Sequence, residues 1–288
     1  LWDSMKAMMD YLQKEDPVTA KSVKKAVQCF EPFHEDEQLY ARHTVNNFRC
    51  RDEVLALLKE IRLKAQFLDG DREAGFNTEQ NALIAVNAEK YYTTMMGFDN
   101  ESWNVRDRHM METLDRLMKF HGPDAKGIVW EHNTHIGDAR ATDMKRARMV
   151  NIGQLAREEY GEENIFLCGF SGYKGTVIAG DEWGAPMQEM EVPEAKPSSI
   201  EARLYKKNKG DGYLIFKEET DEEYDSYMPH RAIGVVYDPV MEKYGNYVPS
   251  VLSQRYDALF YFDKTRALHP LHLHPDKNKL PETYPFSF

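Results

Sequence analysis

Cysteine is scarce in this 288-residue sequence, which holds only Cys29, Cys50 and Cys168. Their number is odd, they lie far apart, and none of them stands in a Cys-x-x-Cys spacing. We therefore expect neither a disulfide framework nor a structural zinc site. A reducing compartment is the default for such cysteine usage, and the sequence predicts a cytoplasmic protein.

Long apolar runs and surplus positive charge are also missing. No segment reaches the length of a membrane span, and no charged-then-apolar signal segment opens the chain. The first residue is Leu1 rather than Met, which indicates a processed chain or a fragment. Lys and Arg total 37 against 48 Asp and Glu, a net charge of −11. We predict neither a nucleic acid nor a membrane as partner, because binding to both requires excess positive charge.

The sequence contains enough apolar residues to form a sizeable core. Apolar residues make up 42% of the chain and charged residues 30%, as in soluble globular domains. The pattern divides the chain into a mainly helical part, residues 1–122, and an α/β sheet part, residues 123–288. We expect one composite domain that lacks its N-terminal section.

Helical periodicity dominates the first part. Asp16-Pro17 is a typical helix start, with a capping side chain followed by proline at the first helical position. The predicted helices cover residues 1–12, 18–30, 37–67, 78–96 and 102–120.

The second part alternates short apolar runs with one amphipathic stretch. The runs predict buried strands at residues 128–130, 164–170, 176–180, 212–216, 232–237 and 258–262. Residues 139–160 have a helical period, so the first two strands and this helix form a predicted parallel unit. Residues 186–197 are acidic and contain proline, which predicts a surface loop.

The densest polar cluster, Trp130 to Ala139, follows the first predicted strand. It contains His132 and His135 together with Glu131, Asn133 and Asp138. In open α/β sheets, ligands bind beyond the carboxyl ends of the strands. Either imidazole titrates near neutral pH and can transfer a proton or polarise a carbonyl group.

Two alternatives stay open for this cluster. One histidine can donate to a backbone carbonyl while the other is exposed to solvent. His-x-x-His can also be a metal pair, although this spacing brings imidazoles together on a helix and the segment is predicted to be a loop.

Three other groups of residues invite a functional interpretation. Arg106 and Arg108 begin the helix before the first predicted strand, and guanidinium groups bind carboxylates and developing oxyanions. On composition alone, pairing with the neighbouring acidic residues Asp99, Glu101 and Asp107 on a solvated helix face explains them better. The histidines at positions 269, 272 and 274 lie among prolines, which favours an extended surface tail over a metal site. Ser171 lies in Gly-Phe-Ser-Gly-Tyr, which does not meet the Gly-x-Ser-x-Gly pattern of serine hydrolases.

Several segments, taken in order, resemble the erythromycin esterase-like family. They are Asp16-Pro17, Cys29-Phe-Glu-Pro32, NTEQNALIAVNAEKYY from Asn77, VRDRHMMETLDRL from Val105, WEHNTHIGDA from Trp130, Gly175-Thr176, YDALFYFDKTRALHPL from Tyr256, and Pro281 to Tyr284. The resemblance runs from near residue 1 to about residue 284 and corresponds to the C-terminal two-thirds of a family member. The combination of HNxH with RDRxM at this separation carries most of its specificity.

The resemblance implies an α/β/α fold in which the helix-rich first part packs on a mixed or parallel sheet layered with helices. It implies a carboxylic ester hydrolase that acts on a small-molecule ester without a cofactor. The family is named for the opening of macrolide lactones, an activity that implies macrolide resistance. Some relatives are described as succinoglycan biosynthesis proteins. The implied catalytic residues are His132, His135, Arg106 and Arg108, and the implied substrate-binding residues are Asn133, Asp138 and Glu131.

The resemblance places the water-activating base in a Gly-Glu-x-x-His-Gly segment, which does not occur in this sequence. The expected mechanism is direct attack by water, with an imidazole and a guanidinium holding the carbonyl oxygen. We expect this chain alone not to hydrolyse esters. The alternatives are a metal- or haem-binding module and a non-catalytic protein of polysaccharide biosynthesis.

Overall fold

The computed structural model describes residues 1–65, 72–97, 100–182, 185–207, 210–216 and 224–269. These residues belong to two compact units, Leu1–Pro123 (the first unit) and Asp124–Phe288 (the second unit). The chain combines helices with a mixed sheet of parallel and antiparallel strands, which confirms the predicted α/β fold class.

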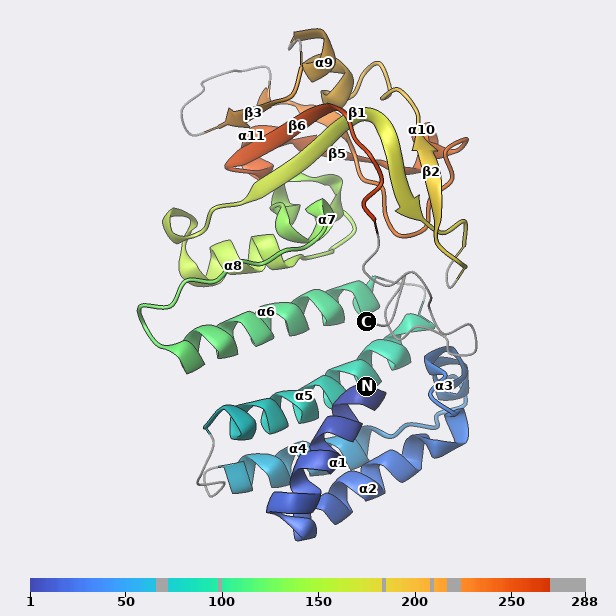
Figure 1. Cartoon of the computed structure of the whole chain (residues 1–288), viewed down its shortest axis with the longest axis vertical. Helices are drawn as coiled ribbons and strands as arrows, with labels where there is room; N and C mark the ends of the chain where they lie inside the picture. Colours follow the sequence, from blue (N-terminus) through green and yellow to red (C-terminus); the bar gives the residue numbers. More distant parts are fainter. Residues whose placement is uncertain (66–71, 98–99, 183–184, 208–209, 217–223, 270–288) are drawn as a thin grey trace. The chain divides into compact units, whose positions relative to one another are not determined.

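The first unit is helical throughout its described residues (Figure 1). Its α-helices are α1 (Trp2–Glu15), α2 (Pro17–Phe30), α3 (Glu37–Thr44), α4 (Arg51–Ala65), α5 (Arg72–Met95) and α6 (Glu101–His121). The predicted start of α2 is confirmed, because the Asp16 carboxylate accepts from the backbone N–H groups of Val18 and Thr19. Such a cap satisfies amide groups that have no partner within the helix.

The prediction of one helix over residues 37–67 was wrong, because the chain leaves the helical path between α3 and α4. Asn47 has a φ of +63°, a left-handed conformation that ends a right-handed helix. The buried phenol of Tyr40 then holds the next turn: it accepts from Cys50 N at 3.0 Å and donates to Glu89 Oε1 at 2.8 Å. A pattern of apolar residues cannot reveal this break, because both helices use the same period.

The expectation of no disulfide was also wrong. Cys29, next to the end of α2, is bonded to Cys50, which is fully buried just before α4. The two residues are 21 positions apart in sequence, and only the folding of α2 against α4 brings them together. Cys168 is a free cysteine. The cysteines therefore no longer favour a reducing compartment.

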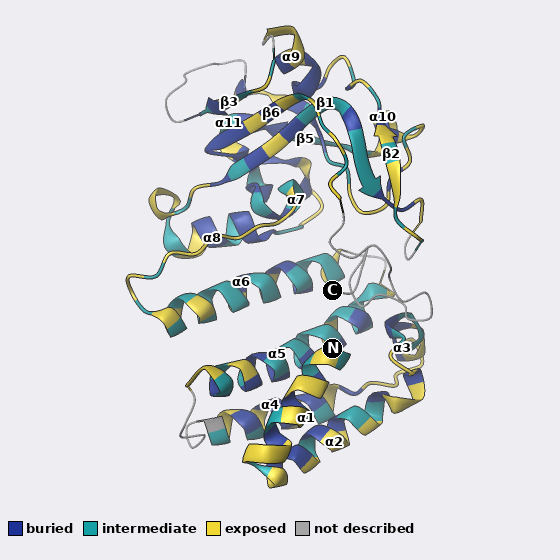
Figure 2. Ribbon diagram, in the orientation of Figure 1, coloured by how far each residue is buried: buried dark blue, intermediate teal, exposed yellow. Residues whose placement is uncertain are grey.

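Apolar side chains from α1 to α5 form the core of the first unit (Figure 2). Val23, Phe30 and Tyr40 are fully buried there, and Met5 and Met8 are 1% exposed. These residues repeat at three- and four-residue intervals along their helices, which is the spacing that the sequence analysis used to predict the helices.

The second unit contains a four-stranded sheet in the order β2-β1-β6-β3 and a separate β4-β5 pair. The strands are β1 (Cys168–Ala179), β2 (Gln188–Val192), β3 (Gly212–Ile215), β4 (Tyr227–Arg231), β5 (Tyr247–Val251) and β6 (Ala258–Lys264). The helices of at least four residues are α7 (Asn133–Ile136), α8 (Ile152–Tyr160), α9 (Ile200–Lys207), α10 (Glu242–Gly245) and α11 (Leu252–Arg255). Figure 1 shows β1 and β6 side by side at the centre of the sheet.

Strand β1 joins two kinds of pairing. Its first half runs parallel to β6, with Phe170 opposite Phe260, and its second half runs antiparallel to β2, starting at Gly175. Gly175 has a φ of +148°, and a Cβ atom at this position would lie 2.1 Å from the Thr265 carbonyl oxygen. Only glycine fits this close approach. The two strands predicted at residues 164–170 and 176–180 are therefore parts of one strand.

Several other predictions for the second unit were wrong. Residues 128–130 form no strand, and Ile128 and Trp130 are 93% and 84% exposed. Residues 139–151 form short 3-10 turns instead of the first half of a helix, and the helix itself is α8. The predicted loop at 186–197 contains β2, while residues 232–237 contribute only an isolated bridge. A short apolar run becomes a strand only when another strand pairs with it, and the sequence does not show which runs are paired.

None of the helices in the described residues is long and apolar enough to cross a lipid bilayer.

Candidate functional site

The two predicted catalytic histidines lie at either end of the first turn of α7, in the second unit. His132 caps the helix: its Nδ1 accepts from Thr134 N at 3.3 Å and lies 2.8 Å from Thr134 Oγ1. His135 is part of the helix and is 8% exposed. The helix cap thus gives the His132 ring a defined orientation, and one short helix holds both imidazoles.

The side chain of Asn133 attaches α7 to the sheet. Its Oδ1 accepts from Phe170 N at 3.1 Å, and its Nδ2 donates to Phe170 O at 2.5 Å. Both polar atoms of the amide are thus used on β1. Glu131, the other predicted substrate-binding residue on this side of the helix, is exposed.

Arg255, at the end of α11, holds α7 from another direction. Its Nη2 donates to Asn133 O at 3.1 Å, and its Nη1 donates to Ser250 Oγ at 2.6 Å. The backbone oxygen of Arg255 accepts from Asp138 N at 2.9 Å. Arg255 is completely buried, so these bonds are not exchanged with water.

Asn151 closes the turn behind α7. Its Nδ2 donates to Thr134 O at 2.8 Å and to Gly137 O, while its Oδ1 caps α8 by accepting from Gln154 N at 3.0 Å. Gly153, in the first turn of α8, allows the close contact, since a Cβ atom there would lie 2.0 Å from the carbonyl oxygen of Ile136. The turn of α7 is thus bonded to three other segments: its backbone to Arg255 and Asn151, and the side chain of Asn133 to β1.

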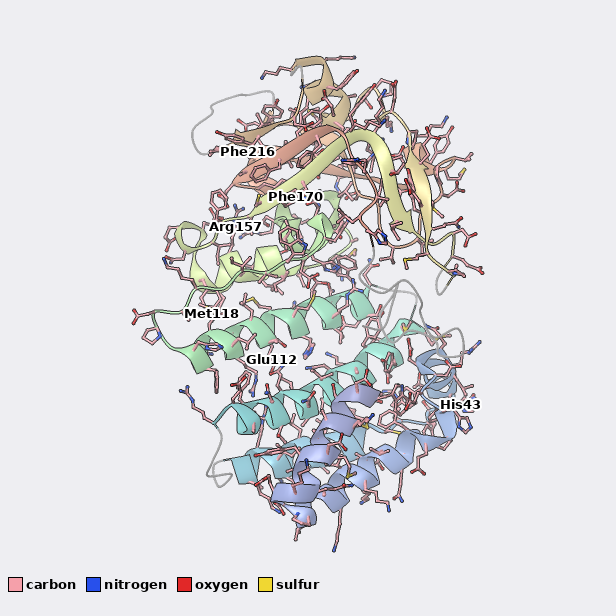
Figure 3. The ribbon with its side chains drawn as sticks, in the orientation of Figure 1. His43, Glu112, Met118, Arg157, Phe170 and Phe216 are labelled. Atoms are coloured by element: carbon pink, nitrogen blue, oxygen red, sulfur yellow. A yellow bond between two sulfur atoms is a disulfide. The ribbon has the colours of Figure 1, made fainter. Side chains whose placement is uncertain are left out.

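An ion network fixes the residues that follow α7. One of its members, Arg157, comes from α8 and is labelled in Figure 3. The Asp138 carboxylate accepts from Arg140 Nη2 at 2.7 Å and from Arg157 Nη1 at 3.2 Å. Arg157 on α8 also donates to Asp257 Oδ2 at 3.0 Å, and the same oxygen accepts from Leu167 N at 2.7 Å. Burial by itself raises the pKa of Asp138. The hydrogen bonds from the two arginines and the charge of Arg140 lower it by more than burial raises it, so the pKa of Asp138 lies below the usual range. Asp138 was predicted to bind substrate, but its carboxylate binds Arg157 of α8, which in turn binds Asp257 just before β6.

The imidazole of His132 is neutral at physiological pH. His132 is exposed to solvent on one side, yet the protein atoms close to its ring remove part of its hydration, and this desolvation lowers its pKa to about 4. The neighbouring His135, Arg255 and His230 act in the same direction, whereas a hydrogen bond to the backbone of Ile233 opposes them. Because Nδ1 accepts from Thr134, the proton of the neutral ring is on Nε2.

A second buried chain of polar groups lies under the site. Glu201 Oε1 accepts from Ser171 Oγ at 3.0 Å and lies 2.7 Å from His230 Nδ1; the other ring nitrogen of His230 lies 3.3 Å from Tyr256 Oη. Burial lowers the pKa of His230. The hydroxyl group of Ser171 is thus directed at a carboxylate and not at an imidazole, which argues against a serine nucleophile.

Tyr256 joins this chain to the backbone next to α7. A Cβ atom on Gly137 would lie 2.7 Å from Tyr256 Cε1, and one on Gly169 would lie 2.8 Å from Tyr256 Cζ. The ring therefore fits between two glycines, one directly after α7 and one on β1. These glycines are required for close packing rather than for an unusual backbone conformation.

The two predicted catalytic arginines belong to α6, in the first unit. Arg106 is half-buried with its guanidinium over the Trp103 ring, 5.0 Å from the centroid, and Arg108 is exposed. The structure brings His132, His135, Asn133 and Asp138 together within the second unit, and it places the arginines on a different unit. Their assignment to one site stays a prediction.

The described residues contain no group of three or more His, Cys, Asp or Glu side chains arranged to hold a metal ion. Of the three C-terminal histidines, His272 and His274 lie outside the described residues.

Sequence reasoning missed Arg255 and Asn151, which hold α7 through its backbone carbonyls. No motif marks them: Arg255 lies 122 positions from the residue whose carbonyl it binds. The only signal was position, because Arg255 directly precedes the Tyr256-Asp257 pair that begins one of the resembling segments.

Comparison with known proteins shows the family to which the chain belongs. The family model described as erythromycin esterase matches residues 1–265. Among solved structures, a succinoglycan biosynthesis protein has 18% identity and a TM-score of 0.69, covering 91% of this chain and 62% of its own. A Bacillus cereus protein has 15% identity and a TM-score of 0.74, covering 92% and 64%.

A third similar structure is a mutant of the erythromycin esterase EreC in its open conformation, with 13% identity and a TM-score of 0.66. It covers 90% of this chain and 64% of its own. This chain thus spans a little under two thirds of the length of these proteins, and the likeness shows a shared fold. The match over residues 1–265 is far more than half of the sequence, and the chain therefore belongs to the erythromycin esterase family.

Proposed function

We propose that this chain carries the oxyanion-stabilising part of a carboxylic ester hydrolase that uses direct attack by water. The observation that carries the proposal is the neutral, oriented imidazole of His132 on a helix turn that also holds His135. Family membership supports a hydrolase. The substrate class, a small-molecule ester that includes macrolactones, is part of the proposal.

The chemistry proposed for His132 is donation of a hydrogen bond. In the neutral ring Nδ1 accepts from Thr134 N, and the ring also has a hydrogen bond to the backbone of Ile233. An ester carbonyl in place of that backbone group would receive the Nε2 proton. As water attacks, negative charge develops on that oxygen and strengthens the bond. A preorganised donor of this kind contributes about 3 to 4 kcal/mol to transition-state stabilisation.

The proposal assigns no general base to this chain. The neutral His132 uses Nδ1 to accept from Thr134 N, and the Gly-Glu-x-x-His-Gly segment that the family resemblance implies is absent from the 288 residues. We therefore expect hydrolysis by this chain only when a base is supplied. Arg106 and Arg108 stay predicted as guanidinium donors.

Chemical rescue tests the proposal. Hydrolysis of a p-nitrophenyl ester and of a macrolactone is measured with 4-methylimidazole as external base, and the rate with the base alone is subtracted. We expect no turnover without the base and a protein-dependent rate with it. His132→Asn and His135→Asn lower this rate by about two to three orders of magnitude, while His43→Asn, an exposed histidine of the first unit, does not change it.

Two results would contradict parts of the proposal. Full rescue in the His132→Asn and His135→Asn variants would remove these residues from the chemistry. Turnover without added base that is lost in His135→Ala would show that the chain contains its own base. Arg106→Gln and Arg108→Gln in the same assay test the two arginines.

A further inference from the structure

The guanidinium of Arg255 is unusual among the buried arginines of the second unit. Arg157 and Arg231 each bind a carboxylate, Asp257 and Glu242 respectively. Arg255 is fully buried, and its two hydrogen-bond acceptors are both neutral: the carbonyl oxygen of Asn133 and the hydroxyl oxygen of Ser250. The guanidinium also lies over the ring of Tyr256, 5.2 Å from its centroid, and its Nε has no hydrogen-bond partner among the described residues. Burying such a charge without a counter-ion destabilises the fold.

The position of this charge is informative because it lies against the start of α7. Asn133, whose carbonyl oxygen binds Nη2 at 3.1 Å, directly follows His132 in the chain. The same carbonyl accepts from Gly137 N at 3.1 Å and so closes the turn. A shift of the guanidinium would therefore move the turn that carries both imidazoles.

We propose that Arg255 is a positioning residue of the two-histidine site, which fixes the turn of α7 through Asn133 O and places an uncompensated positive charge beside His132. The inference rests on the proposed function only in taking His132 as a working group. The titratable or charged side chains whose charge acts on His132 are His135 on α7, His230 on β4 and Arg255. Arg255 is the permanently charged one of the three.

The two effects of Arg255 can be separated by substitution. Arg255→Lys keeps the positive charge but loses the planar guanidinium, whose two Nη atoms bind Asn133 O and Ser250 Oγ at the same time. Arg255→Met removes both the charge and the hydrogen bonds. Ser250→Ala leaves the arginine intact and removes the 2.6 Å contact that orients its Nη1.

Two measurements on the full chain report these effects without any turnover. Long-range ¹H–¹⁵N NMR of ¹⁵N-histidine-labelled protein follows protonation of His132, whose signal is identified with His132→Asn. Amide hydrogen exchange at His135, Ile136 and Gly137 follows the turn of α7. A failure of the rescue assay would therefore leave this test unaffected.

We expect Arg255→Met to make His132 bind its proton about tenfold more tightly, because a nearby positive charge is removed. Arg255→Lys and Ser250→Ala should keep the proton affinity within twofold and accelerate exchange of the α7 amides several-fold. Arg231→Lys is the matched control: it lowers thermal stability and changes neither measurement at α7.

Unchanged exchange in both Arg255→Lys and Ser250→Ala would refute the positioning role. Unchanged proton affinity of His132 in a folded Arg255→Met variant would refute the electrostatic role. If Arg255→Met does not fold, Arg255→Gln, which is neutral and retains a hydrogen-bond donor, replaces it, and the same tenfold change is required.

Discussion

The disulfide between Cys29 and Cys50 gives the sharpest stability prediction for the first unit. It closes a loop over a sequence separation of 21 residues. In the chain-entropy description, cross-linking a loop of this length disfavours the unfolded state by about 3 kcal/mol. Reduction should therefore lower the folded-to-unfolded ratio of this unit by roughly two orders of magnitude.

Urea unfolding followed by circular dichroism at 222 nm measures the effect, since the first unit supplies most of the long helices. With a dependence on urea of about 2 kcal/mol per molar, we expect dithiothreitol to lower the midpoint by about 1.5 M. A Cys29→Ser, Cys50→Ser double variant should unfold at the midpoint of the reduced protein and no longer respond to the reductant. Cys168→Ser is the control and should respond as the unmodified chain does.

The same reasoning predicts the thiol count. Protein purified without reductant and unfolded in guanidinium should react with one equivalent of Ellman's reagent, from Cys168, and with three after reduction. Three reactive thiols before reduction, or an unchanged urea midpoint after it, would refute the reasoning.

Two further predictions concern the second unit. Asp257→Asn removes one of the two buried carboxylates that bind Arg157, while Asp138 still binds the same guanidinium. We expect this variant to destabilise the unit by about 1 to 3 kcal/mol in chemical denaturation, whereas Asp143→Asn, at an exposed site, should have no measurable effect; equal midpoints for the two variants would contradict the assigned network. The pKa of His132 is about 4 in the folded chain and about 6.5 in the unfolded chain. Its contribution to stability is therefore complete above pH 6.5 and is lost as the pH falls towards 4. The free energy of unfolding of His132→Gln should depend less on pH over this interval, and an identical pH dependence would count against the low pKa.

The helices of the first unit show what local sequence is able to determine. The Asp16 cap and Pro17 define the start of α2, and apolar residues at three- and four-residue spacing define the buried faces of α1, α2 and α5. These signals lie within a few residues of the structure they cause, because helix hydrogen bonds join residues four apart. The resemblance that led to the family rested on the same kind of short, ordered segments.

The strands and the disulfide were decided by tertiary structure. The apolar run at residues 128–130 has the composition of a buried strand, yet it pairs with no strand in the described part of the chain, whereas the acidic segment that contains β2 pairs with β1. Pairing depends on residues far away in the sequence, and so does the meeting of Cys29 with Cys50.

The candidate site divides in the same way. The sequence by itself determined that His132 and His135 lie in one polar segment, but the loop predicted for that segment was wrong, because Asn133–Ile136 form the helical turn α7 with His132 as its cap. Only the tertiary structure decided that Asn133 and Asp138 bind β1 and two arginines, and that Arg255 reaches α7 from 122 positions away. The physical reason is that burial, and with it the protonation state of His132, is set by atoms that folding brings together from several segments.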